Sequence, residues 1–174
     1  DQPRSRGLGD VYKRQVVENT DAGVSARVYP ALISNTHPLA SVHGSFNAVF
    51  VKAEAADDLM FYGRGAGKLP TASAVVADMA DCIKHMNRRK IFGWGPGDEN
   101  YVVDYKSSIS MPFYVRAKMA AQEVLNKFDD VKFLSRKGQP SDEVAFITDA
   151  MTENELREKL GDANVINIIK VTNY

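Results

Sequence analysis

Three alternating glycines constrain this chain more than any other feature of its sequence. They lie in residues 63–72, GRGAGKLPTA, directly after the apolar run 59–62. Glycine adopts positive φ without steric cost and lets a ligand approach the backbone closely. Proline is favoured at the start of a helix, because its missing N–H would be unpaired there. The pattern predicts a short buried strand at 59–62, a glycine turn, and a helix from Thr71 to Met86.

The predicted helix 71–86 has one apolar stripe, which is the spacing of a helix that buries one face. The stripe consists of Val75, Val76, Met79, Ala80, Ile83 and Met86. Residues 87–90, NRRK, place positive charge at its C-terminal end, where the helix dipole favours cations.

The glycine turn is a candidate ligand site, because a helix N-terminus presents free N–H groups to a phosphate or pyrophosphate. Two sharper phosphate motifs are excluded by their spacing. A P-loop would need glycine and serine or threonine where Tyr62 and Leu69 stand. The dinucleotide fingerprint would need glycine in place of Lys68 or Pro70. The turn is therefore either a ligand-approach turn or simply a tight connection.

The remaining pattern predicts a mixed α/β (α+β) protein. Strands are expected at 26–29 and 45–52, separated by the turn residues 34–38. The breaker-rich residues 93–100 predict a linker, in which Trp94 is either a buried lid or an exposed contact.

The last third predicts a βαββαβ segment, a split arrangement that gives an antiparallel four-stranded sheet with both helices on one face. Strands are expected at 113–117, 131–134, 143–148 and 165–171, and helices at 120–128 and after Thr152. Phe113, Val115 and Ala117 should share one buried face, and Val124, Leu125 and Phe128 should point inward. Thr152 and Glu155 form a capping box, and Gly161 ends the second helix.

Charge, cysteine content and hydropathy exclude several function classes. Lys+Arg and Asp+Glu both number 22, so no net field attracts nucleic acid or an anionic membrane. The single cysteine, Cys82, rules out an internal disulfide, suits a reducing cytosol, and is expected to be a small buried group. No apolar run approaches the roughly 20 residues of a membrane span.

No catalytic or metal-binding set emerges from the titratable residues. The three histidines, His37, His43 and His85, lack ligand spacing and are expected to be surface or hydrogen-bonded residues. Asp57, Asp58, Asp78 and Asp81 are expected on a solvated loop and helix face. Residues 1–15, DQPRSRGLGDVYKRQ, show no period that would create a core face. They are interpreted as adapter-derived sequence, with a flexible native terminus as the alternative.

The sequence resembles the homoserine dehydrogenases over residues 24–86. The resemblance rests on four segments: SARVYPALI (25–33), HPLASV (37–42), GSFNAV (44–49) and YGRGAGKLPTASAVVA (62–77). Members of this family reduce aspartate semialdehyde to homoserine with NADPH or NADH, in threonine, isoleucine and methionine biosynthesis. Their N-terminal Rossmann domain is followed by a catalytic domain whose sheet also forms the dimer.

The resemblance implies that Gly67 contacts the nicotinamide nucleotide, NADP or NAD. Gly65, Ala66 and Thr71 are further candidates by adjacency. It implies no catalytic residue in this chain, because the family's catalytic lysine and acidic substrate-binding residues lie upstream of it, and Lys68 does not match them. The chain alone is expected to be inactive and, with its helical stripe uncovered, to self-associate.

The βαββαβ segment is similar, more loosely, to an ACT domain, which many family members append for threonine feedback. Its first strand–helix junction, AKMAA (117–121), lacks the proline and glycine of the family pattern, which alters the usual amino-acid pocket. The alternative is a non-catalytic module that binds an amino acid or a partner, or only dimerises. A third possibility is a subunit that completes its active site with a separate chain.

The resulting prediction is a cytoplasmic homo-oligomer that acts on a small-molecule substrate, with threonine as a possible effector. Residues 16–91 are assigned to the end of the catalytic and dimerisation domain, 92–107 to a linker, and 108–174 to an ACT-type regulatory domain.

Overall fold

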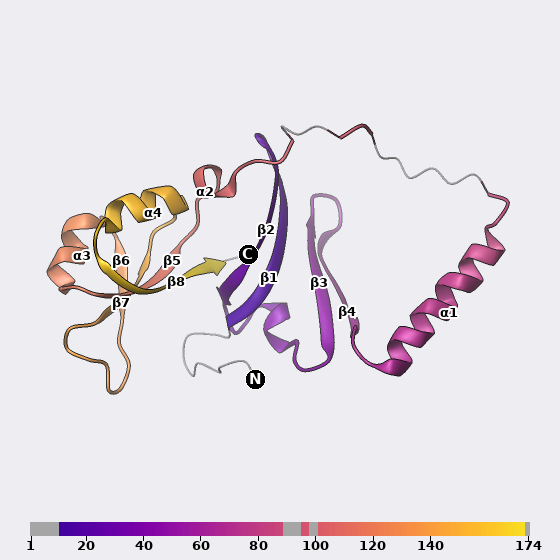
Figure 1. The fold of residues 1–174 in the computed structure, drawn as a ribbon, viewed down its shortest axis with the longest axis horizontal. Coiled ribbons are helices and arrows are strands. Elements are labelled where there is room, and N and C mark those ends of the chain that lie inside the picture. The colour runs from indigo at the N-terminus through magenta and orange to yellow at the C-terminus, as the bar shows by residue number, and fades with distance from the viewer. Residues whose placement is uncertain (1–10, 89–94, 98–100, 173–174) are drawn as a thin grey trace. The chain divides into compact units, whose positions relative to one another are not determined.

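The computed structural model describes residues 11–88, 95–97 and 101–172 and divides the chain into two compact units. The sheet unit comprises residues 1–35 and 98–174, and the hairpin unit comprises residues 36–97, in each case as far as they are described (Figure 1). Trp94 and the basic residues Arg89 and Lys90, singled out in the sequence, lie outside the described residues.

The sheet unit begins with a hairpin of two long strands, β1 (Val11–Thr20) and β2 (Gly23–Ile33). They pair antiparallel from Val11↔Leu32 to Thr20↔Gly23. The predicted strand 26–29 is confirmed within β2. The expectation that residues 1–15 contribute no secondary structure is wrong for residues 11–15. These residues pair with β2, and the residue pattern of the segment by itself does not reveal that partner.

The βαββαβ prediction for the last third is confirmed. The elements are β5 (Phe113–Lys118), α3 (Ala121–Lys127), β6 (Val131–Leu134), β7 (Val144–Thr148), α4 (Glu153–Leu160) and β8 (Asn164–Thr172). The strands lie in the order β8-β5-β7-β6, and each neighbouring pair is antiparallel. Helix α4 has the predicted capping box of Thr152 and Glu155, and its C-cap is Gly161.

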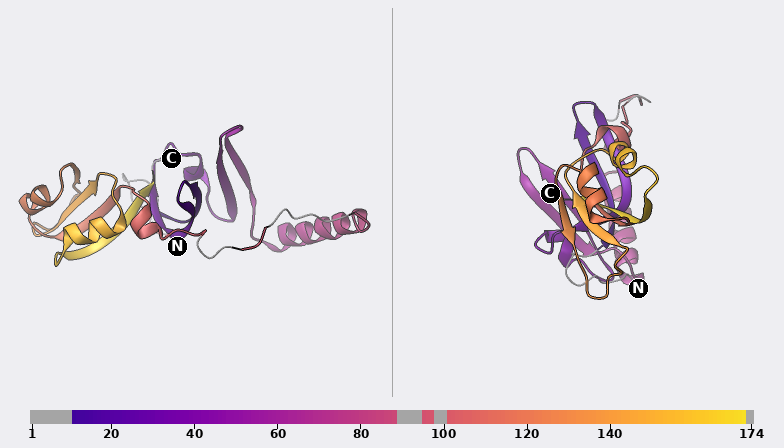
Figure 2. Two further views of the ribbon diagram at one scale, coloured as in Figure 1. Left: turned by 90° about the horizontal axis from the view of Figure 1, so that it is seen from above. Right: turned by 90° about the vertical axis from the view of Figure 1, so that its left-hand side faces the viewer.

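The core of this segment lies between one sheet face and both helices. Phe113, Val115 and Ala117 of β5 are at most 1% exposed, and they cluster with Val124 of α3 and Leu156 of α4. Figure 2 shows the two helices on the same side of the four strands. The predicted helical layer is therefore confirmed.

One inward-facing residue of α3 was predicted wrongly. Leu125 is 53% exposed, whereas Val124 and Phe128 are buried. Helix α3 has only seven residues, and one buried stripe of residues four apart holds Val124 and Phe128 but excludes their neighbour.

Strand β8 joins the two parts of the sheet unit. Its second edge pairs parallel with β2 through Ala31↔Lys170, Leu32↔Val171 and Ile33↔Thr172, which makes a six-stranded sheet. Residues 101–108, which the sequence assigned to a linker and its border, also attach to β2. The N–H of Val24 donates to the carbonyl of Tyr101 at 2.8 Å, and the short helix α2 (Tyr105–Ser108) follows.

The hairpin unit contains a short 3-10 turn at Pro38–Ser41, then β3 (Phe46–Ala53), β4 (Asp57–Arg64) and α1 (Lys68–Lys84). β3 and β4 pair antiparallel from Phe46↔Arg64 to Ala53↔Asp57. The predicted strands 45–52 and 59–62 and the helix after the glycine turn are thus confirmed. The helix begins three residues earlier than expected, so Pro70 is its third residue. An N–H group at the third helical position would also have no intrahelical acceptor, so proline is tolerated there.

The hairpin unit buries no apolar side chain among its described residues, where His37 alone is buried. The expectations of a buried strand at 59–62 and a buried Cys82 are therefore wrong: Phe61 is 63% exposed, and Cys82 is exposed. Both residues lie on apolar surfaces that have no covering layer within this unit. No helix of the described chain is long and apolar enough to cross a membrane.

The exposed stripe of α1 predicts self-association of the chain. The stripe residues Val75, Val76, Met79, Ile83 and Met86 are each at least 53% exposed. Burial of one large apolar side chain is worth about 1.5–3 kcal/mol, so contact between copies is favourable. Light scattering should show association of the wild-type chain and a shift towards monomer for Met79→Lys/Ile83→Lys.

The matched control is Ala77→Lys, which adds a charge to the opposite face of α1. It should associate like the wild type. A monodisperse monomer for the wild-type chain would contradict the expectation.

Candidate functional site

The glycine turn forms the connection between β4 and α1. Gly65, Ala66 and Gly67 make up the three connecting residues, and Thr71 lies in the first turn of α1. The structure therefore brings all four predicted cofactor-facing residues together in one exposed stretch of the hairpin unit.

Gly67 has a backbone conformation that only glycine adopts readily. Its φ is 125° and its ψ is 151°, a region that costs other residues about 1–3 kcal/mol. A Cβ at this position would lie 3.3 Å from Cδ of Pro70. The Gly67 carbonyl accepts a hydrogen bond from the Thr71 N–H at 3.1 Å, which begins α1. Gly67 thus sets the direction in which the helix leaves the turn.

Gly65 allows the turn to approach strand β3. A Cβ at residue 65 would overlap the side-chain amide of Asn47. Asn47 pairs with Gly63 across the hairpin, so its amide lies beside the glycine turn. Sequence reasoning missed Asn47, because its position opposite the glycines follows only from the register of β3 and β4.

The N-terminus of α1 supplies hydrogen-bond donors at the turn. The N-cap is Gly67, and no side chain caps the helix. The backbone N–H groups of Lys68 and Leu69 have no intrahelical acceptor and carry the positive end of the helix dipole. By contrast, Pro70 has no N–H, and the Thr71 N–H is bonded to Gly67. Glycines around such a helix end leave room for an anion, so the arrangement suits a phosphate group.

A flat aromatic surface adjoins the turn on the same hairpin. The rings of Phe46 and Tyr62 stack with centroids 4.9 Å apart and planes 4° apart, and the Arg64 guanidinium lies 4.9 Å from the Phe46 ring centroid. Residues 47–49 and 61–65 line an open hollow beside it. Stacked rings with an adjacent cation can bind a planar, negatively charged ligand.

Among the described residues of the hairpin unit, the other titratable side chains form no reaction centre. His37 is buried, and its Nδ1 accepts a hydrogen bond from the Leu39 N–H at 3.1 Å. His85 pairs with Asp81 at 3.0 Å. Throughout the described part of the chain, no three His, Cys, Asp or Glu side chains come together to hold a metal ion.

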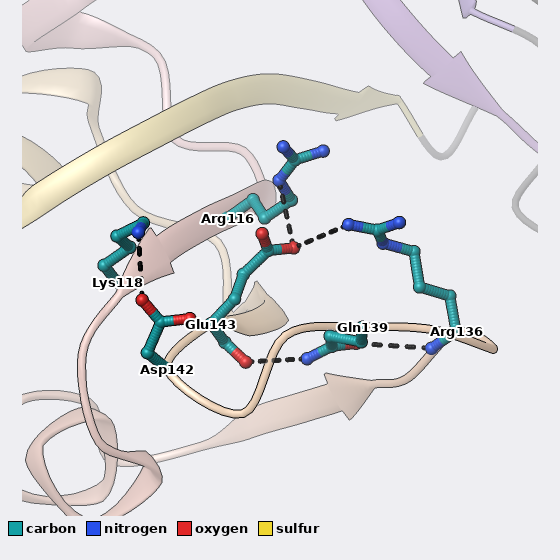
Figure 3. Close-up of polar contacts among 6 residues, drawn as sticks. All are labelled: Arg116, Lys118, Arg136, Gln139, Asp142 and Glu143. Carbon is teal, nitrogen blue, oxygen red and sulfur yellow. Dashed lines mark hydrogen bonds and ion pairs between the residues drawn. The ribbon is translucent and has the colours of Figure 1, made fainter.

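The C-terminal segment carries a buried carboxylate, Glu143, between two guanidinium groups (Figure 3). Its Oε1 lies 3.2 Å from Arg116 Nε and 3.2 Å from an Arg136 nitrogen, and its side chain is 5% exposed. Beside it, the Lys118 ammonium lies 2.9 Å from Asp142. Hydrogen bonding to Lys118 lowers the pKa of Asp142. These pairs fix the loop before β7 against the end of β5.

A second buried carboxylate, Glu153, opens helix α4. Its two oxygens accept hydrogen bonds from Lys170 at 2.8 Å and from Arg157 at 2.8 Å. Burial by itself raises the pKa of Glu153, but hydrogen bonds from Lys170 and Arg157 together outweigh burial, and its pKa is lowered. The ionised form is therefore the one that the folded chain stabilises.

Replacing Gly67 by alanine should destabilise the start of α1. The substitution forces a Cβ into a glycine-only conformation and should cost about 1–3 kcal/mol. Hydrogen exchange at the Thr71 amide should become faster. Gly63→Ala is the control, because a Cβ there meets nothing within 4 Å. Equal exchange at Thr71 in both variants would contradict the assignment.

The stability of the sheet unit should depend on the ionisation of Glu153. A lowered pKa contributes stability that is present above the ordinary value of 4.5 and is lost as the pH falls through the folded value. Glu153→Gln should lower the free energy of unfolding by about 2 kcal/mol at neutral pH. Denaturant titrations should show this difference shrinking below pH 4.5.

The control for that measurement is Glu158→Gln, which removes an exposed carboxylate from the same helix. A Glu153→Gln difference that stays constant down to acid pH would show that the carboxylate charge is not the cause.

Comparison with known proteins matches the β1–β2 hairpin, β3, β4 and most of α1 to one enzyme family. The family model for homoserine dehydrogenase matches residues 4–80. The chain is 48% identical over 100 residues to the homoserine dehydrogenase of Mycobacterium leprae, covering 56% of this chain and 22% of that protein. It is 53% identical over 81 residues to that of Corynebacterium glutamicum, covering 46% of this chain and 17% of that protein.

Two solved structures extend the similarity of fold to nearly the whole chain. The homoserine dehydrogenase of Thiobacillus denitrificans matches with a TM-score of 0.76 at 22% identity, covering 95% of this chain and 43% of that one. That of S. aureus matches with a TM-score of 0.67 at 23% identity, covering 96% and 42%. The chain thus spans less than half the length of these proteins.

The sequence match includes the glycine turn, β3, β4 and most of α1, and the fold match also includes the C-terminal βαββαβ segment. The relatives that match in sequence and in fold carry the same family name. The chain matches the homoserine dehydrogenase family of oxidoreductases over residues 4–80, and its fold is similar to that of solved members over nearly its whole length.

Proposed function

We propose that the chain is the C-terminal part of an enzyme that interconverts aspartate semialdehyde and homoserine with NADP or NAD. The observation that supports this most directly is the glycine turn. It lies inside the family match, and Gly67 holds it in a conformation that leaves the backbone open to a ligand.

The residues of the turn fit a nicotinamide nucleotide. Gly65, Ala66, Gly67 and Thr71 form part of the wall of its site. The backbone N–H groups of Lys68 and Leu69 are directed to a phosphate. The absence of a Cβ at Gly65 and Gly67 provides the necessary room. The nucleotide itself supplies the hydride in this reaction. The role of the chain is to bind and orient it.

The chain alone does not catalyse hydride transfer under this proposal. A hydride donor must be held against the substrate by a complete site. The described residues of the hairpin unit offer an exposed turn, and no acid–base pair is assigned there. The enzyme acts as a cytoplasmic homo-oligomer in which further residues complete the site.

The C-terminal βαββαβ segment is proposed to be an ACT-type regulatory domain with threonine as its effector. Its strand order β8-β5-β7-β6 and the helical layer support this assignment. The junction of β5 and α3 lacks proline and glycine, and Lys118 there already pairs with Asp142. These features alter the usual amino-acid pocket. The alternative is a domain that only stabilises or dimerises, and the titration below decides between the two.

The proposal is tested by calorimetric titration of the 174-residue chain with threonine and then with NADPH, together with an assay of homoserine-dependent NADP reduction. We expect threonine to bind with a stoichiometry of one per chain, NADPH to bind weakly, and no reduction to occur. Serine at the same concentration is the control for threonine specificity.

The Gly67→Ala variant separates the two sites. It should abolish the NADPH signal and leave threonine binding unchanged, because the two sites belong to different units. The absence of a binding signal on titration with threonine would overturn the regulatory assignment. NADPH binding that Gly67→Ala leaves unchanged would overturn the assignment of the turn, and measurable NADP reduction would overturn the predicted inactivity.

A further inference from the structure

The ammonium group of Lys170 contacts three elements of the sheet unit at once. It lies 2.8 Å from Glu153 of α4 and 5.0 and 5.1 Å from the ring centroids of Tyr29 in β2 and Tyr105 in α2. The Lys170 and Glu153 side chains are only 13% and 10% exposed. A cation within about 6 Å of an aromatic ring is attracted to it, most strongly where water is excluded.

The partners of Lys170 come from distant parts of the sequence. Tyr29 belongs to the strand that the family match includes, whereas Glu153 belongs to the C-terminal segment. Between these parts, β2 and β8 share only three residue pairs, with one added hydrogen bond from the Thr172 hydroxyl to the Leu32 carbonyl at 3.2 Å. Such a short parallel ladder is a small contact to hold two elements in register.

We propose that Lys170 is a coupling residue through which the position of helix α4 controls the attachment of β2 to β8. A buried ammonium cannot give up its carboxylate partner without a large cost in free energy. When α4 moves, Lys170 must therefore follow Glu153 or lose this ion pair. Either change alters the contact of Lys170 with the Tyr29 ring. Arg157 holds the second oxygen of Glu153, so the carboxylate moves with α4 itself.

The coupling concerns contacts within this chain, and only its use in regulation rests on the proposed function of the C-terminal segment. An effector that displaces α4 would in that case change how firmly β2, the strand that leads into the catalytic part, is attached to β8. The same three contacts act in the opposite direction, because coupling between two sites is reciprocal.

The test is hydrogen exchange of the β2 amides at residues 31–33, measured in a set of variants without nucleotide or amino acid. Glu153 lies on α4 and not on β2, yet the Glu153→Gln substitution should speed exchange at residues 31–33 several-fold. In a Lys170→Met background it should have no further effect there. Amides of Val115 and Phe146 report the stability of the C-terminal core, and Lys118→Met is the control for loss of a lysine from an exposed pair.

Tyr29 provides a second route that keeps Lys170 intact. Tyr29→Leu should remove the response of residues 31–33 to Glu153→Gln, whereas Tyr29→Phe, which retains the ring, should preserve it. The proposal is overturned if Glu153→Gln acts equally in the Lys170→Met background, or if it leaves β2 unchanged. Because no ligand is used, neither result depends on the outcome of the threonine or NADPH titrations.

Discussion

Strand β8 is the element on which the sheet unit depends, because it joins the β1–β2 hairpin to the C-terminal strands. One edge pairs with β5 from Phe113↔Lys170 to Lys118↔Asn164, and the other meets β2 over three residue pairs. Without β8, the β1–β2 hairpin would keep only the isolated bridge between Val24 and Val102 among the described residues, and an isolated hairpin is marginally stable in water. The contacts of Lys170 lie at this same junction, where charge and aromatic rings supplement a short ladder.

The hairpin unit differs from the sheet unit, because it has regular secondary structure but little burial of apolar side chains. Its hairpin is regular and its helix is long, yet none of the described apolar residues of either is buried. A helix of this length obtains most of its stability from packing of an apolar face. The glycine turn lies between these two elements, so the candidate cofactor site belongs to the unit whose described residues form no buried apolar core.

Local patterns predicted most of the elements. The alternation of Phe113, Val115 and Ala117, the capping box at Thr152, and the turn before Pro70 each depend on neighbours within a few residues. The glycine turn was predicted for the same reason, because such a turn and the helix after it form one local unit. The contact of its residues with a cofactor stays a prediction, which rests on the family resemblance. Strand β1 and the short helix α2 were missed. β1 has a non-local partner, and α2 has only four residues behind the Asp104 cap.

Burial was predicted least well, because it depends on what covers a surface and not on the residues that form it. Cys82, Leu125 and the strand 59–62 all have apolar character, yet Cys82, Leu125 and three of the four strand residues proved exposed. The sequence by itself determined where helices, strands and the glycine turn form, since propensity, capping and φ preference act locally. Only the tertiary structure decided that β8 joins β2, that Asn47 lies against Gly65, and that Lys170 contacts Glu153 and Tyr29. These contacts join residues far apart in the chain, and no local spacing encodes them.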